Sequence, residues 1–151
     1  MTGPSTPPAP LDLPQYGATF GQAIARFWGK YTTFSGRASR SEYWWAYLFN
    51  VLVSAVLWML TLILASAGAH VDPTTGQTVP GGGAFFVAIV VALWALAIVI
   101  PSLAISWRRL HDTNRSGGFW FMGFIPFVGY IILIVLLVLD SNPAGARFDR
   151  R

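Results

Sequence analysis

The sequence has no cysteine among its 151 residues, and only 11% of the residues are charged. The absence of cysteine excludes a disulfide scaffold, a thiolate metal site and a cysteine nucleophile. The scarcity of charge excludes a soluble globule, because a typical soluble domain carries about 25% charged residues. Hydrophobic residues make up 54% of the chain, and the mean hydropathy is +0.55. This composition excludes extensive disorder and predicts a small integral membrane protein.

Half of the ten prolines lie within the first 14 residues, a segment with neither a basic residue nor an apolar run. This pattern is typical of a disordered or polyproline-like tail, which we predict for residues 1–15, and not of a signal peptide. Residues 16–150 are then expected to form a single integral membrane domain.

Three long stretches without any charged residue follow, over residues 43–65, 84–105 and 117–139. A helix needs about 20 apolar residues to cross a bilayer, and a helix satisfies its own backbone hydrogen bonds in lipid. The pattern therefore predicts an all-α membrane protein with three transmembrane helices. Ser39 and Glu42 have the spacing of a capping box, which marks the start of the first helix.

Residues 16–34 have the periodicity of an amphipathic helix. Its apolar face consists of Phe20, Ile24, Phe27, Trp28, Tyr31 and Phe34. Arg26 and Lys30 lie on the opposite face. We predict that this helix lies in the cytoplasmic membrane interface, with both cations toward anionic lipid headgroups. Packing against the chain's own transmembrane bundle is the alternative.

Basic residues are unevenly distributed between the apolar stretches. Those shortly before the first stretch are Arg26, Lys30, Arg37 and Arg40. The segment between the first two stretches has none, and the next segment contains Arg108, Arg109 and Arg115. Because cytoplasmic loops are enriched in Lys and Arg, this distribution predicts a cytoplasmic N-terminus and a cytoplasmic second loop.

The third stretch allows two topologies. Three full spans place the C-terminal arginines outside, and we favour this arrangement because the charge rule is a bias and not a law. The alternative is a re-entrant third segment, kinked at Pro126, which returns the tail to the cytoplasm. Such a segment must be buried in protein or line water.

Two polar strings border the apolar stretches. Residues 34–45 read Phe-Ser-Gly-Arg-Ala-Ser-Arg-Ser-Glu-Tyr-Trp-Trp, and residues 108–120 read Arg-Arg-Leu-His-Asp-Thr-Asn-Arg-Ser-Gly-Gly-Phe-Trp. Together with Ile-Pro-Phe-Val-Gly at residues 125–129, they closely resemble the YhaH-like family of small bacterial inner-membrane proteins, domain of unknown function 805. The resemblance covers about residues 31–149 and departs from the family pattern at residues 118–120 and 144–149. It implies a multi-pass protein of the inner (plasma) membrane, with no established enzymatic activity, cofactor or substrate.

The predicted topology brings both polar strings to the cytoplasmic face. The candidate site residues are Arg37, Arg40, Glu42, Arg108, Arg109, His111, Asp112 and Arg115. Five arginines against two carboxylates suit recognition of a phosphate, for which the guanidinium has bidentate geometry. The alternative is a structural role, in which these charges anchor and orient the helices.

Catalysis is disfavoured, because the sequence has no nucleophile motif and no carboxylates at productive spacing. Its two histidines are expected on opposite sides of the membrane, which disfavours a metal site. We therefore predict a non-enzymatic membrane component, without cofactor or metal, that binds anionic lipid headgroups or a partner subunit through the cytoplasmic cluster. A small oligomeric transport or channel subunit is the alternative. Nucleic acid is not an expected partner, because anionic lipid explains the basic residues beside the membrane helices.

Overall fold

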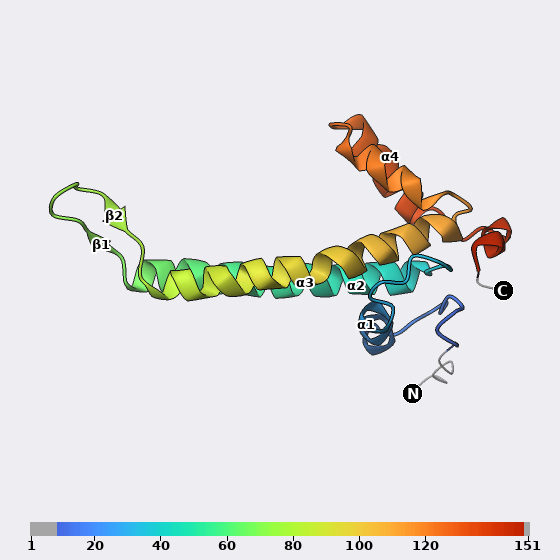
Figure 1. The fold of residues 1–151 in the computed structure, drawn as a ribbon, viewed down its shortest axis with the longest axis horizontal. Coiled ribbons are helices and arrows are strands. Elements are labelled where there is room, and N and C mark those ends of the chain that lie inside the picture. The colour runs from blue at the N-terminus through green and yellow to red at the C-terminus, as the bar shows by residue number, and fades with distance from the viewer. Residues whose placement is uncertain (1–8, 150–151) are drawn as a thin grey trace. The chain divides into compact units, whose positions relative to one another are not determined.

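The computed structural model describes residues 9–149 and is mostly helical (Figure 1). Its elements in chain order are α1 (Phe20–Gly29), α2 (Arg40–Ala67), β1 (His70–Val71), β2 (Thr78–Val79), α3 (Gly83–Asp112), the 3₁₀ helix η1 (Gly117–Phe124), α4 (Val128–Val138) and the 3₁₀ helix η2 (Pro143–Phe148). Among the described residues, α2 and α3 are the two helices long and apolar enough to cross a membrane.

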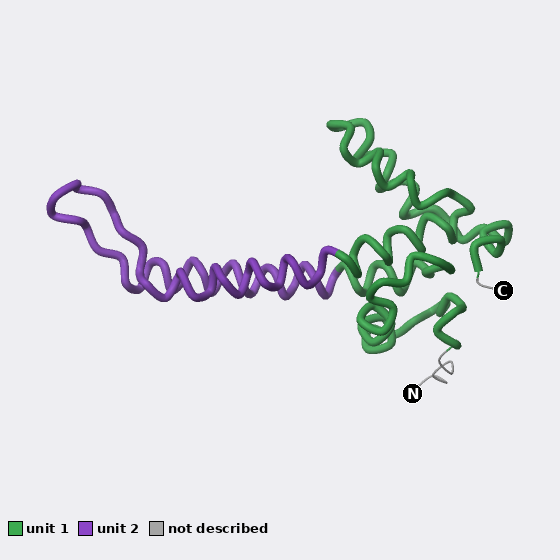
Figure 2. Tube along the Cα trace, in the orientation of Figure 1, with its two compact units in different colours: residues 1–47, 100–151 green, residues 48–99 purple. Residues whose placement is uncertain are grey.

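The chain divides into two compact units (Figure 2). Residues 48–99 form one of them, which we call the hairpin unit. Residues 9–47 and 100–149 form the other, which we call the polar unit. Each long helix begins or ends in the polar unit and extends through the hairpin unit.

In the hairpin unit, parts of α2 and α3 are connected by a short antiparallel pair in which His70 lies opposite Val79. The indole nitrogen of Trp94 donates to Ser54 Oγ at 3.3 Å, which links the two helices. Apolar side chains point outward, with Leu62 67% and Leu96 69% exposed. In each of the two helices, no residue of the most apolar 18-residue window is buried in protein. Such a surface is unfavourable in water and suits a hydrocarbon environment.

The polar unit has a small apolar core formed by side chains from α1, α2, α3 and α4. Its members include Phe27, Ala46, Ile105, Leu110 and Leu136. The predicted capping box at the start of α2 is confirmed: Ser39 N donates to Glu42 Oε2 at 2.8 Å, and Glu42 N donates to Ser39 Oγ at 3.2 Å.

The helix expected over residues 16–34 is shorter, and its charged face is oriented differently. α1 begins after Thr19, whose side chain and that of Gln22 form a second capping box. Arg26 and Lys30 are buried, at 6% and 3% exposed, whereas Phe20 and Trp28 are among the exposed residues. The prediction that these two cations face lipid headgroups is therefore wrong, because they face carbonyl and carboxylate groups of the chain itself.

The segment expected to be a disordered tail also differs within the described residues. Leu13 N donates to Pro10 O at 3.1 Å, and Gln15 is buried with its backbone N–H 3.2 Å from Glu42 Oε2. Residues 9–15 therefore pack within the polar unit. The rest of that prediction, over residues 1–8, falls outside the described residues.

The third stretch, residues 117–139, does not form one continuous helix. It consists of η1 and α4, separated at Ile125–Phe127, where Phe127 has a left-handed φ of 59°. α4 has 11 residues and is therefore about 16 Å long, roughly half of the hydrocarbon thickness of about 30 Å. A Cβ at Gly129 would lie 1.9 Å from Met122 O, so only glycine allows this close packing of α4 on η1.

The C-terminal segment contacts the second polar string. Asn142 N donates to Asp112 O at 2.7 Å, and the Phe148 ring stacks on His111. An external C-terminus would place these partners on opposite sides of the membrane. The favoured arrangement of three full spans therefore does not fit the structure.

Candidate functional site

Arg109 and Asp112 form a fully buried ion pair in the last turn of α3. Both side chains are 0% exposed, and Arg109 Nη1 donates to Asp112 Oδ2 at 2.5 Å. Arg109 Nε donates to Leu137 O at 3.0 Å, and its Nη2 donates to Leu139 O. Carbonyls at a helix C-terminus lack intrahelical partners, so Arg109 caps α4 from the side. All of these partners belong to the chain itself, so the Arg109 guanidinium has a structural role.

Asp112 is a meeting point for several segments distant in sequence. Its Oδ1 accepts from Tyr16 Oη at 2.9 Å, and its Oδ2 also accepts from Ser141 Oγ. Burial, together with the neighbouring Asp112 carboxylate, raises the pKa of Tyr16, so the hydroxyl keeps its proton as donor. The carboxylate thereby joins the N-terminal segment, the end of α3 and the segment after α4.

Arg37 and His111 hold the C-terminal segment. Arg37 binds Asp149 through two nitrogens, with Nε–Oδ1 at 2.9 Å and Nη2–Oδ2 at 2.7 Å. This ion pair raises the pKa of Arg37 further above its usual value. The His111 ring lies 4.1 Å from the Phe148 ring at an interplanar angle of 4°, and its Nδ1 is 3.0 Å from Gly36 O. Both residues therefore have structural partners.

A second set of buried charged residues surrounds Glu42, which forms an ion pair with Arg26. Arg108 is 1% exposed, and its Nε donates to Ala104 O at 3.3 Å. The Nη2 atom of Arg108 is buried and has no hydrogen-bond partner in the part of the chain that the structure describes. Burial lowers the pKa of Lys30 to about 8, to which Arg108 and Arg26 also contribute, while Glu42 opposes the shift. Arg26, Lys30 and Arg108 thus all lie in the electrostatic field of the buried Glu42 carboxylate.

Arg40 and Arg115 differ from the other six candidate residues because they are exposed. Arg40 Nη1 pairs with Asp140 Oδ1 at 2.9 Å, and the two side chains are 44% and 91% exposed. Arg40 Nε donates to Leu139 O at 3.1 Å. The Arg115 guanidinium lies 5.9 Å from the centre of the Phe119 ring.

Two hollows meet at the Arg40–Asp140 pair. One has a volume of about 360 Å³ and is polar, with Ser39, Ser41 and Ser141 in its wall. The other has a volume of about 300 Å³ and follows the exposed side of α4. Its apolar wall consists of Ile134, Val135, Val138 and Leu139. Arg40 and Asp140 line both hollows, so a polar and an apolar space adjoin the same ion pair.

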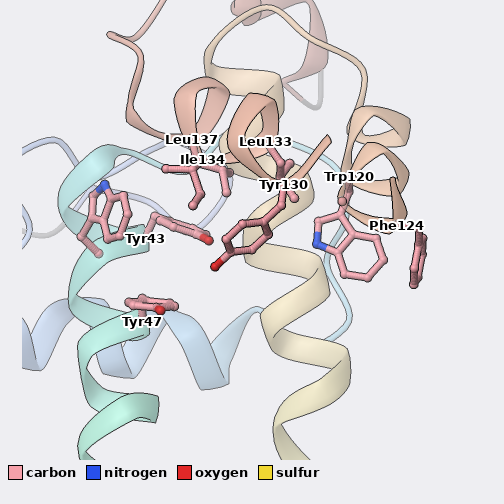
Figure 3. Close-up of a pocket in the computed structure, with 10 residues that line it drawn as sticks. Tyr43, Tyr47, Trp120, Phe124, Tyr130, Leu133, Ile134 and Leu137 are labelled. Atoms are coloured by element: carbon pink, nitrogen blue, oxygen red, sulfur yellow. The ribbon is translucent and has the colours of Figure 1, made fainter. Parts of the chain in front are cut away.

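A third hollow, of about 360 Å³, lies between the start of α2, η1 and α4 (Figure 3). Aromatic and aliphatic side chains form most of its wall, and none of its lining residues is charged. The hydroxyl ends of Tyr43 and Tyr130, which both line this hollow, point toward one another (Figure 3). This lining suits hydrocarbon and has no group for binding an anion by charge.

Sequence reasoning missed several partners of the site. Arg26 and Lys30 have helical spacing, but their periodicity does not reveal whether that face meets lipid or protein. Tyr16, Asp140 and Asp149 are remote in sequence from the arginines they contact, so no local signal could pair them. Within residues 9–149, no group of three His, Cys, Asp or Glu side chains could hold a metal ion.

Two long helices with outward apolar side chains, together with a polar cluster at their ends, define a helical integral membrane protein. Over residues 31–150 the chain matches the family described as "Protein of unknown function (DUF805)". The chain belongs to this family, which confirms the resemblance found in the two polar strings.

Curated relatives of the chain are bacterial inner membrane proteins. It is 35% identical to "Inner membrane protein YhaI" of Escherichia coli (strain K12) over 118 residues, which cover 78% of this chain and 84% of the relative. It is 33% identical to "Inner membrane protein YhaH" of the same strain over 118 residues, which cover 78% of this chain and 85% of the relative. No solved structure matches the chain significantly.

Proposed function

We propose that this protein is a non-enzymatic component of the bacterial inner membrane that binds the anionic phosphate of a lipid headgroup at Arg40. The observation that carries this proposal is the position of Arg40, which lines both a polar and an apolar hollow. A phospholipid has a polar and an apolar part joined at its phosphate, so it matches this arrangement. An acidic partner subunit would use the polar hollow but would have no need of the apolar one.

The buried residues of the cluster support the site without forming it. Arg109 caps the end of α4 through Leu137 and Leu139, and Leu139 O also accepts from Arg40. The buried Arg109 therefore positions the carbonyl to which Arg40 is bound. In addition, α2 begins at Arg40, and the N-terminus of a helix favours an anion through its dipole.

The distribution of charge supports a topology for this proposal. We place the spans in α2 and α3, both chain termini on the cytoplasmic side, and residues 117–139 as a re-entrant segment. All ten Lys and Arg residues of the sequence fall outside residues 41–107, which agrees with the positive-inside bias for this topology. The short α4 and the pairing of Arg37 with Asp149 support the same arrangement.

Native mass spectrometry of the gently extracted protein tests the binding function. We expect the wild-type protein to retain phospholipid and Arg40→Ala to lose most of it. Arg147→Ala is the matched control, because it removes an exposed arginine whose guanidinium lies over the Phe148 ring. Equal retention by Arg40→Ala and the control would overturn the proposed function.

The topology is tested separately by cysteine labelling, for which the cysteine-free chain is well suited. In spheroplasts, a membrane-impermeant maleimide is expected to label Thr74→Cys in the β1–β2 turn and to leave Ala146→Cys in η2 unlabelled. Both variants should react after permeabilisation. Labelling of Ala146→Cys in intact spheroplasts would contradict a cytoplasmic C-terminus.

A further inference from the structure

The Arg40–Asp140 pair offers two opposite charges at the junction of the polar and apolar hollows. We infer that the site selects a phospholipid whose headgroup carries a primary ammonium group, with the phosphate on Arg40 and the ammonium on Asp140. This inference rests on the proposed function, since it specifies the headgroup that the same site accepts. The acyl chain then follows the apolar side of α4.

The existing ion pair does not block such a ligand. The Asp140 side chain is 91% exposed and that of Arg40 is 44% exposed, and exposed ion pairs contribute little to stability. Arg40 uses Nε on Leu139 O and Nη1 on Asp140. No protein acceptor within residues 9–149 occupies its Nη2. Once Asp140 turns to the ammonium of the ligand, Nη1 and Nη2 of Arg40 are both open to the phosphate, in the bidentate geometry that guanidinium groups favour.

The other polar side chains of the polar hollow are already hydrogen-bonded within the chain and form a fixed wall around the ion pair. Ser39 and Ser41 lie at the start of α2, with their Oγ atoms 3.0 Å apart. Ser141 lies beside Asp140 and orients its hydroxyl toward Asp112. All three line the hollow of about 360 Å³ that contains Arg40 and Asp140. Its wall thus surrounds the pair with small polar side chains.

The charge of Asp140 is what discriminates between headgroups. A headgroup that carries only negative charge would place its phosphate beside a carboxylate without any compensating cation. A choline headgroup has a cation but no N–H group to donate to the carboxylate oxygens. A primary ammonium supplies both the charge and the donors. We therefore expect the preference ethanolamine over choline and over glycerol.

The test is a competition of defined lipids on the delipidated full-length protein, read by native mass spectrometry. Phosphatidylethanolamine, phosphatidylcholine and phosphatidylglycerol with identical acyl chains are supplied in equal amounts. We expect a several-fold excess of bound phosphatidylethanolamine on the wild-type protein. Asp140→Asn should abolish this preference and still bind phospholipid, while Asp72→Asn in the β1–β2 turn, the matched control, should keep the wild-type preference.

The outcomes separate this inference from the proposed function. An unchanged ethanolamine preference in Asp140→Asn, or equal binding of the three lipids by the wild-type protein, overturns the inference and leaves the proposed function standing. Undiminished binding of every lipid by Arg40→Ala overturns the proposed function itself. Soluble glycerophosphoethanolamine is the remaining arm. Its displacement of the lipid at equal concentration would show that the ligand is a free phosphoamine and not a membrane lipid.

Discussion

The hairpin unit and the polar unit of this small protein are stabilised in opposite ways. In the hairpin unit, apolar side chains such as Leu62 and Leu96 point outward, and a hydrogen bond from Trp94 to Ser54 links the two helices. In the polar unit, charged side chains such as Arg109 and Asp112 are fully buried and bind one another. The first unit depends on a lipid environment for its exposed surface. The second depends on specific pairing, because buried charge is costly unless it is paired.

The largest effect is expected when the central carboxylate of the polar unit is removed. Asp112→Ala leaves Arg109 buried without its ionic partner and also removes the acceptor of Tyr16. Breaking a buried pair in this way costs about 3–5 kcal/mol. We expect a correspondingly large fall in the thermal stability of the detergent-solubilised protein. Arg115→Ala, at an exposed site, should change stability by less than about 0.5 kcal/mol. Equal effects of the two substitutions would show that the polar unit does not depend on its buried ion pair.

The buried Lys30 predicts an unusual pH dependence. Its folded-state pKa of about 8 is below the ordinary 10.5, so between these values the unfolded chain binds a proton that the folded chain lacks. The free energy of unfolding should therefore rise with pH across this window, by about 1–3 kcal/mol. The Lys30→Met variant should show no such rise. Thermal melts of the wild-type protein and of Lys30→Met from pH 8 to 9.5 measure this rise. Parallel pH curves for the two proteins would exclude Lys30 as the source of the rise.

The hairpin unit is expected to be most sensitive to substitution at Gly81, where the segment before α3 lies close to the end of α2. A Cβ at Gly81 would lie 2.6 Å from Leu64 O and 2.7 Å from Gly68 Cα. We expect Gly81→Ala to cost about 1–3 kcal/mol through overpacking and to increase proteolysis of the β1–β2 turn. Gly82→Ala is the matched control, because nothing lies within 4 Å of its added Cβ. Identical proteolysis of both variants would contradict this close approach.

The smallest effect is expected for the side-chain hydrogen bond inside the hairpin unit. Ser54→Ala removes the acceptor of the Trp94 indole N–H. Such hydrogen bonds between membrane helices contribute about 0.6 kcal/mol on average. Unfolding in mixed detergent micelles should detect a loss of this size. A loss comparable to that of Asp112→Ala would show that the hairpin unit also depends on polar pairing.

Much of the fold was predictable from local patterns. The uncharged runs located α2 and α3, and the Ser39–Glu42 spacing located the start of α2. The third run also met the hydropathy criterion, but the backbone breaks around Phe127. Hydropathy measures how apolar a segment is, and it does not measure whether the segment is one continuous helix.

The candidate site was predictable in composition more than in arrangement. Both polar strings do meet in the polar unit, and six of the eight candidate residues are buried or half-buried there. However, Arg37 binds Asp149 and Arg109 binds the carbonyls after α4, which assigns these arginines to the fold. Arg40 stands out only because Asp140 and two hollows lie beside it.

The sequence alone determined that the chain belongs in a membrane, because the free energy of transferring long apolar runs depends on composition and length. It also determined where the long helices lie and where the basic residues gather. Only the tertiary structure decided which charges are buried, which pair with the remote C-terminal segment and which stay exposed. Those outcomes depend on contacts between residues far apart in the chain, and electrostatic energy depends on distance and burial, which no local pattern contains.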